Sequence, residues 1–213
     1  MNKKVIIIGA GGQGKVIADI IKCNRDEVIG FLDDHEIDQL NEYSVLGKVN
    51  DAPKFMNQEY YFIVAIGNAR IRKQIIEKLR GFGARLYIAI HPSSVIANDV
   101  IIGEGCAVMA NVVINSCSSI GVGCIINTSS TVDHDCNIMD YVHVAPGSHL
   151  SGTVSVCEGT WLGVGSIVSN NLRISGGNTD NPIMIGAGAV VVHDINCSGT
   201  YVGLPARKVI HHE

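Results

Sequence analysis

Positive charge, aromatic side chains and long apolar runs are all scarce in this sequence of 213 residues. With 20 acidic and 16 basic residues, it has no excess of positive charge for binding a phosphate backbone. No run of about 18 apolar residues predicts a membrane-spanning helix, and the apolar start from Val5 to Ile8 is too short for a secretory signal. We therefore expect a cytoplasmic protein that binds neither nucleic acid nor membrane.

Paired cysteines are also missing. The seven cysteines are odd in number and none forms a C-x-x-C pair, which argues against a disulfide framework and a zinc knuckle. We expect reduced, structural thiols and no metal. Because no cysteine is obviously paired with a histidine, a covalent acyl-enzyme would lack its nucleophile.

The first part of the chain alternates strand and helix signals. The predicted strands are 4–8, 28–32, 61–66 and 85–90, and the predicted helices are 13–23 and 69–82. Such alternation indicates a parallel sheet with right-handed crossovers. His91-Pro92 marks a break, because the residue before proline is pushed to extended geometry. We predict a Rossmann-like α/β domain over residues 1–92.

From residue 95 onward the aliphatic residues recur every six positions, without exception over fourteen repeats. These positions are Ile96, Ile102, Val108, Ile114, Ile120, Ile126, Val132, Ile138, Val144, Leu150, Val156, Leu162, Val168 and Ile174. A small or β-branched residue follows four positions later in nearly every repeat. This pattern predicts a left-handed parallel β-helix over residues 93–213, with three hexapeptides in each coil. The segment 175–184 interrupts the period as an external loop.

A glycine-rich segment, Gly9-Ala10-Gly11-Gly12-Gln13-Gly14, lies between the first predicted strand and helix. Asp33 and Asp34 follow about twenty residues later, which is the dinucleotide-binding spacing. Such a turn presents helix N–H groups to a phosphate. Because no second mononucleotide half follows, a single nucleotide linked to a sugar is favoured over NAD. The segment Gly67-Asn68-Ala69-Arg70 would face the same crevice, where Asn68 is equally well explained as a helix N-cap.

Two histidines stand out among the outward positions of the predicted β-helix. His134 points outward beside Asp135, whose carboxylate can accept from the imidazole and raise its basicity, as a general base requires. His143 lies half a coil further on, on the opposite side of the prism. One chain would not bring the two together, whereas a homotrimer would place His134 of one subunit near His143 of the next.

The order of several motifs resembles the PglD/NeuD-type sugar O-/N-acyltransferase family over essentially the whole chain. These motifs are residues 9–14, Phe31-Leu32-Asp33-Asp34, Ala65-Ile66-Gly67-Asn68, Asn127-Thr128-Ser129-Ser130, Asp133-His134-Asp135 and Val202–Arg207. The resemblance implies transfer of acetyl from acetyl-CoA to the 4-amino group of a nucleotide-linked 4-amino-4,6-dideoxyhexose, as in the synthesis of a bacterial surface glycan. The reaction would be a direct attack.

The resemblance also implies roles for individual residues. His134 would be the general base with Asp135 as its acidic partner, the Gly152 N–H would be an oxyanion donor, Asn127 would position the acyl group, and His143 would contact the thioester. The channel for acetyl-CoA would be lined by Gly163, Val164, Gly186 and Ala187. The nucleotide sugar would be held by Gly11, Gly12, Gln13, Asp33, Asp34, Gly67, Asn68 and Arg70.

Two other functions stay open at this point. O-acetylation of a sialic acid would use the same base, but would not need a site for a diphosphate. An NAD-binding oxidoreductase or sensor module joined to a structural β-helix would need the second mononucleotide half that the sequence lacks. The sequence does not distinguish UDP, dTDP and GDP, nor the stereochemistry of the sugar.

Overall fold

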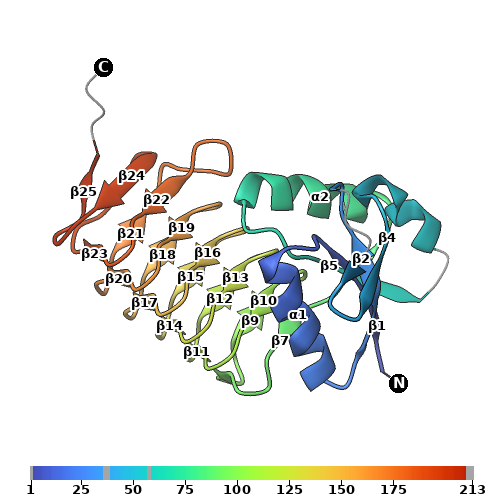
Figure 1. Cartoon of the computed structure of the whole chain (residues 1–213). Helices are drawn as coiled ribbons and strands as arrows, with labels where there is room; N and C mark the ends of the chain where they lie inside the picture. The colour runs from blue at the N-terminus through green and yellow to red at the C-terminus, as the bar shows by residue number, and fades with distance from the viewer. Residues whose placement is uncertain (1, 36–38, 57–58, 210–213) are drawn as a thin grey trace.

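The computed structural model describes residues 2–35, 39–56 and 59–209 and contains an α/β domain followed by a three-sided β-helix (Figure 1). The elements of the α/β domain are β1 (Lys4–Ile8), α1 (Gly12–Cys23), β2 (Glu27–Leu32), β3 (Gln39–Leu40), β4 (Tyr43–Gly47), the 3₁₀ helix η1 (Val49–Phe55), β5 (Tyr60–Val64), α2 (Ala69–Gly81) and β6 (Arg85–Leu86). Its sheet has the order β3-β4-β2-β1-β5-β6. Strand β1 is central and pairs in parallel with β2 and β5, which confirms the predicted parallel sheet.

The core of this domain follows from its apolar pattern. Residues Val5–Ile8 of β1 are fully buried, as expected for a central strand covered on both faces. On α1 the buried side chains Ile17, Ile20 and Ile21 form one helical face toward the sheet.

Two features of this domain differ from the sequence-based expectation. The predicted strand 85–90 is in fact two strands, because β6 pairs with β5 whereas β7 (Ala89–Ile90) pairs with β10 of the β-helix. The chain therefore passes from sheet to coil between Leu86 and Ala89. The antiparallel pair β3 and β4 and the helix η1 were not predicted, because these short, half-exposed segments at the sheet edge carry no sustained apolar period.

The β-helix has three faces, each a sheet of very short strands. The eight-stranded face contains β7, β10 (Ala107–Val108), β13 (Ile125–Ile126), β16 (His143–Val144), β19 (Trp161–Leu162), β22 (Ile183–Ile185), β24 (Gly199–Val202) and β25 (Arg207–Lys208). The six-stranded face contains β8 (Val95–Ile96), β11 (Val113–Ile114), β14 (Thr131–Val132), β17 (His149–Leu150), β20 (Ile167–Val168) and β23 (Val190–Val191). The five-stranded face contains β9 (Ile101–Ile102), β12 (Ser119–Ile120), β15 (Asn137–Ile138), β18 (Ser155–Val156) and β21 (Arg173–Ile174).

The period of six is confirmed as the inward-facing period. Val108 pairs with Ile126 and Ile126 with Val144, so equivalent aliphatic residues stack one coil apart inside the prism, where all three are fully buried. The small inward positions occupied by Cys106 and Cys124 are also fully buried, as predicted for packing residues.

The corners of the prism use a left-handed backbone conformation that the aliphatic pattern does not reveal. Twelve corner residues, six positions apart, have φ between +57° and +72°. They are Gly105, Asn111, Cys117, Gly123, Ser129, Asp135, Tyr141, Gly147, Thr153, Gly159, Gly165 and Asn171. Glycine, asparagine and aspartate adopt this conformation most easily, so the series is enriched in them.

The predicted loop 175–184 interrupts the coils without shifting their register, but it ends at residue 182, because Ile183 and Met184 already pair with β24 as part of β22. After residues 175–182, Leu162 pairs with Ile185 of β22, and Ile185 in turn pairs with Tyr201 of β24. Strand β25 then folds back antiparallel to β24 and ends the described chain.

The α/β domain packs on the first strands of the eight-stranded face (Figure 1). Ala89, Ala107 and Ile125, on three successive coils, share one apolar cluster with Ile17 of α1. Tyr141 shares a second cluster with Ile76 of α2. In the described part of the chain, neither α-helix is long and apolar enough to cross a membrane.

Candidate active site

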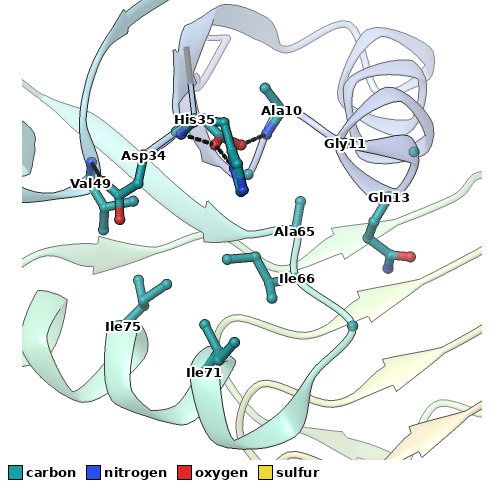
Figure 2. Close-up of a pocket in the computed structure, with 14 residues that line it drawn as sticks. Ala10, Gly11, Gln13, Asp34, His35, Val49, Ala65, Ile66, Ile71 and Ile75 are labelled. Atoms are coloured by element: carbon teal, nitrogen blue, oxygen red, sulfur yellow. Dashed lines mark hydrogen bonds and ion pairs between the residues drawn. The ribbon is translucent and has the colours of Figure 1, made fainter. Parts of the chain in front are cut away.

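A crevice of about 540 Å³ opens at the carboxyl ends of β1, β2 and β5 (Figure 2). This is where open α/β sheets bind ligands, beside the point at which the strand order reverses. The predicted ligand residues on its wall are Gly11, Gly12, Gln13, Asp33, Asp34 and Gly67. Ile66, Ile71 and Ile75 supply an apolar side. The structure therefore brings together two segments, 9–13 and 33–35, that follow different strands.

Asp33 braces the glycine-rich turn. Its Oδ2 accepts from Ala10 N at 2.6 Å, and its Oδ1 accepts from His35 N at 2.8 Å and lies 2.7 Å from His35 Nδ1. Partial burial raises the pKa of this carboxyl, but the hydrogen bonds from Ala10 and His35 outweigh burial and lower it. Asp33 is therefore ionised, while Asp34 Oδ1 accepts from Val49 N at 3.0 Å.

The N-terminus of α1 leaves room for a ligand. A Cβ built on Gly11 or Gly12 would meet no atom within 4 Å, so neither glycine is required by packing. In contrast, a Cβ on Gly14 would run into the Gly9 carbonyl. The Nε2 of Gln13 is buried and has no hydrogen-bond partner, which is costly unless a ligand supplies one.

Two predicted residues of the second segment lie off the wall of the crevice. Asn68 is the N-cap of α2, and its side chain accepts from Ile71 N at 3.1 Å. Arg70 Nε lies 3.2 Å from Asp180 Oδ1, in the loop that follows β21. The N-cap explanation of Asn68 therefore holds, and Arg70 links α2 to the loop.

His134 lies at an exposed corner after β14. Its Nδ1 is 2.7 Å from Asp135 Oδ2, and this hydrogen bond, together with the Asp133 charge, raises the imidazole pKa. Because Nδ1 donates to Asp135, Nε2 is the nitrogen free to take up a proton. A Cβ built on Gly152 would fall 2.5 Å from His134 Nε2, so a side chain at this position would displace the ring from where it lies. The Gly152 N–H donates to no backbone carbonyl in the described residues.

His143 has the opposite surroundings. It lies on β16, only 5% exposed, with its ring tilted against that of Trp161 at 4.1 Å between centroids. Burial, and then the positive charge of Arg72, lower its pKa to about 4, while the backbone of Gly67 acts weakly in the other direction. His143 is therefore neutral at physiological pH.

The neighbours of His143 also fix its tautomer. Asn127 Oδ1 accepts from Thr128 N at 2.8 Å, so Asn127 Nδ2 faces His143 Nε2, 3.2 Å away, and donates to it. The proton of the neutral ring then resides on Nδ1. That Nδ1 is buried without a partner. In the described residues, His143 Nδ1 and Gln13 Nε2 are the two buried side-chain nitrogen or oxygen atoms without one.

The two histidines lie on different faces of the β-helix. His134 follows a strand of the six-stranded face, whereas His143 belongs to the eight-stranded face on which the α/β domain packs. A single chain does not bring them together, as the half-coil spacing predicts.

The four residues predicted to line a CoA channel stack on successive coils. Leu162 pairs with Ile185 and Gly163 N donates to the Ile185 carbonyl at 2.8 Å, which places Gly163 over Gly186 and Val164 over Ala187. Val164 is 55% exposed.

Similarity to known proteins agrees with this geometry. Residues 4–79 match the family model of the PglD N-terminal domain. The chain is 32% identical to a GDP-perosamine N-acetyltransferase of Escherichia coli over 189 residues, 85% of this chain and 82% of that protein. The chain belongs to the PglD/NeuD-type acyltransferase family. The fold and the membership inferred from the sequence motifs are thereby confirmed.

Solved structures of related proteins cover the whole PglD/NeuD-type architecture. The acetyltransferase domain of PglB from Neisseria gonorrhoeae, in complex with acetyl coenzyme A, superposes with a TM-score of 0.92 at 36% identity over 98% of this chain and 100% of that one. PerB from Caulobacter crescentus, in complex with CoA and GDP-perosamine, superposes with a TM-score of 0.89 at 38% identity over 97% of each chain.

Sequence reasoning missed two residues that lie beside this candidate site. Trp161 lies against His143, and a Cβ on Gly67 would lie 3.8 Å from its ring, so the indole extends from the β-helix toward the Gly67 segment of the crevice. It pairs with His143 one coil away, a spacing that would have identified it. Arg72, buried between the domains, has no comparable signal in the sequence.

A cluster of metal-ligating side chains lies elsewhere in the described residues. Asp19, Cys23 and His91 place one ligand atom each within 4.8 Å of one another. However, the Ser93 N–H donates to His91 Nδ1 at 3.1 Å, which occupies Nδ1 and leaves the ring proton on Nε2. Neither nitrogen is ready to bind an ion, so we assign none to this cluster.

Proposed function

We propose that this chain transfers acetyl from acetyl-CoA to the 4-amino group of a nucleotide-linked 4-amino-4,6-dideoxyhexose. The observation that carries the proposal is the pair of buried, unpartnered nitrogens. Gln13 Nε2 lies on the wall of the crevice, and His143 Nδ1 lies on the β-helix. Among the described residues neither nitrogen donates in a hydrogen bond of normal geometry, although the Gly67 backbone lies near the His143 ring. Each could therefore donate to a ligand, Gln13 to the sugar nucleotide and His143 to the thioester.

The geometry supports a direct attack with His134 as the general base. The amine nitrogen attacks the thioester carbonyl carbon while His134 Nε2 removes its proton. Asp135 holds the ring in the required tautomer through Nδ1. Gly152 lies beside the His134 ring, and its N–H would stabilise the oxyanion. Collapse of the tetrahedral intermediate breaks the carbon–sulfur bond, and CoA leaves as the thiol after taking the proton from His134.

The remaining predicted residues fit this scheme. Asn127 donates to Nε2 of neutral His143 and so keeps the ring proton on Nδ1, from which it would donate to the acyl group. The pantetheine arm would lie along two successive coils, beside Gly163 and Val164 on one and Gly186 and Ala187 on the next, where Val164 and Ala187 are exposed. The crevice takes the nucleotide diphosphate at the N-terminus of α1.

We infer that the active protein is a homotrimer with its active sites between subunits. The support is the placement of His134 and His143 on different faces of one prism. A neighbouring subunit related by a three-fold axis supplies the second histidine. We place the enzyme in the cytoplasm, where acetyl-CoA and nucleotide sugars are available.

The decisive experiment measures release of the CoA thiol with GDP-, UDP- and dTDP-linked 4-amino-4,6-dideoxyhexoses and with N-acetylneuraminic acid. We expect release with a nucleotide-linked amine, first with the GDP-linked sugar named in the relatives. Release only with the sialic acid would favour O-acetylation. No release, together with binding of NAD, would favour a nucleotide sensor.

A variant at the crevice separates the two substrates. Gly11→Val places a branched side chain where the structure has open space, so the fold is retained. It should raise KM for the nucleotide sugar about tenfold, the effect of losing about 1.4 kcal/mol of binding, and leave KM for acetyl-CoA unchanged. An equal rise in both constants would mean that the turn is only structural.

A further inference from the structure

Arg72 on α2 is a fully buried charged residue at the contact between the two domains. No carboxylate pairs with it among the described residues, and its guanidinium donates instead to backbone carbonyls. Burial lowers its pKa to about 10, which leaves it charged at neutral pH. Burying a charged guanidinium is costly unless its N–H donors are satisfied. The acceptors of the Arg72 hydrogen bonds therefore indicate the role of this residue.

Two of these hydrogen bonds reach the β-helix. Arg72 Nε donates to Gly123 O at 2.7 Å and Arg72 Nη2 donates to Tyr141 O at 2.6 Å. Both acceptors are corner residues with left-handed φ, on successive coils of the prism. Tyr141 lies just before β16, the strand that carries His143.

The other two hydrogen bonds reach the crevice. Arg72 Nη1 donates to Ile66 O at 2.8 Å and to Gly67 O at 2.7 Å. Ile66 and Gly67 follow β5 and line the crevice. One guanidinium thus joins the wall of the nucleotide site to the coil that carries His143, through donors held in a rigid plane.

We propose that Arg72 is a positioning residue that fixes the distance between the nucleotide crevice and the acyl group. The inference rests on the proposed function, because it concerns how the bound sugar meets acetyl-CoA. The nucleotide is held by one domain and the thioester by the other. A small displacement of the Gly67 segment would therefore leave each ligand bound but move the amine away from the carbonyl carbon. A misplacement of about 1 Å can reduce the rate about 100-fold.

The test compares Arg72→Lys and Arg72→Leu with Lys73→Met. Lys73 is the neighbouring residue on α2 and also joins the domains, through an ion pair of 2.6 Å with Glu158. It makes no hydrogen bond to the crevice, so it is a matched control. For each trimer, kcat and KM would be measured well below the melting temperature, and the dissociation constants of GDP and acetyl-CoA by calorimetry. Turnover by the wild-type enzyme is measured first, and this tests the proposed function separately from the role of Arg72.

We expect Arg72→Lys to lower kcat about 100-fold, while both dissociation constants stay within about twofold of wild type. Lys73→Met should keep kcat within about twofold. A folded Arg72→Lys enzyme with wild-type kcat would overturn the proposal, as would an equal loss in Lys73→Met. If Arg72→Leu does not fold, Arg72→Lys alone decides, because it retains the charge and one donor group but not the planar fork.

Discussion

His134 and His143 lie nine residues apart in one β-helix, and their surroundings change the imidazole pKa in opposite directions. The Asp135 carboxylate raises the pKa of exposed His134, whereas burial lowers that of His143 to about 4. A repeating scaffold thus offers two distinct environments, an open corner and a strand covered by another domain. Two titratable groups with separated pKa values are the usual basis for separate roles in acid–base chemistry. In the mechanism proposed above, the same residue type would act as a base at one position and as a neutral donor at the other.

The largest expected effect comes from removing the exposed member of the pair. His134→Ala should lower kcat by roughly 10² to 10⁴ and leave acetyl-CoA binding unchanged. Its side chain is largely exposed, so stability should change little. Raising the pH should partly restore turnover, because more free amine is then present.

The control variant is His149→Ala. It changes an exposed histidine on the adjacent strand β17 of the same face and should retain activity. Near-normal turnover in His134→Ala would remove the base from the mechanism.

The second prediction concerns the buried member and the assembly. His143→Ala removes a neutral donor and should lower kcat about 10²-fold. If the two histidines of a site come from different chains, subunit exchange between equal amounts of His134→Ala and His143→Ala trimers should restore about a quarter of wild-type activity. Light scattering would measure the mass of each variant and of the exchanged mixture. Failure to restore activity after proven exchange would place both residues in sites built from one chain.

A smaller effect should come from the partner of His134. Asp135→Asn removes the carboxylate charge that strengthens the hydrogen bond from His134 Nδ1 and raises the His134 pKa, while its amide oxygen can still accept from Nδ1, and should lower kcat about tenfold. Because the neutral imidazole is the active form, kcat/KM falls as the pH drops through its pKa. Loss of the carboxylate lowers that pKa, so the acidic limb of the profile should move to lower pH. If the acidic limb does not move, a group other than His134 is responsible for it. His143, with a pKa of about 4, should contribute no limb near neutrality.

The smallest effect concerns the corner above His134. Thr153 has a φ of +63° and a β-branched side chain, a combination that is strained. Thr153→Asn should raise the free energy of unfolding by roughly 0.5 to 1 kcal/mol, because asparagine adopts this conformation more easily. Chemical denaturation would measure the gain, and kcat should not change. A loss of stability would show that the Thr153 methyl group makes contacts worth more than the strain.

Periodicity explains which parts of the molecule were predictable. The β-helix repeats one local rule, so positions such as Val108 and Ile126 could be assigned from spacing alone, as could the outward position of His134. The crevice followed from the glycine-rich turn and Asp33. Arg72 could not be found, because its partners are backbone carbonyls of Gly67, Gly123 and Tyr141, distant in sequence and independent of side-chain identity. The pairing of β7 with the coils was likewise decided by tertiary contacts.

The left-handed corners have a consequence for the evolution of the site. Asp135 occupies a corner with φ of +58°, a conformation that glycine adopts without steric cost. An L-residue there gives up roughly 1 kcal/mol of stability. The fold alone would therefore favour glycine at this position, whereas the hydrogen bond that orients the His134 ring, our proposed base, comes from the aspartate carboxylate. Selection for stability alone, as in a screen for heat resistance, would tend to replace the aspartate. We expect the resulting protein to be more stable but to react more slowly, so that the trade-off between stability and activity is confined to one residue.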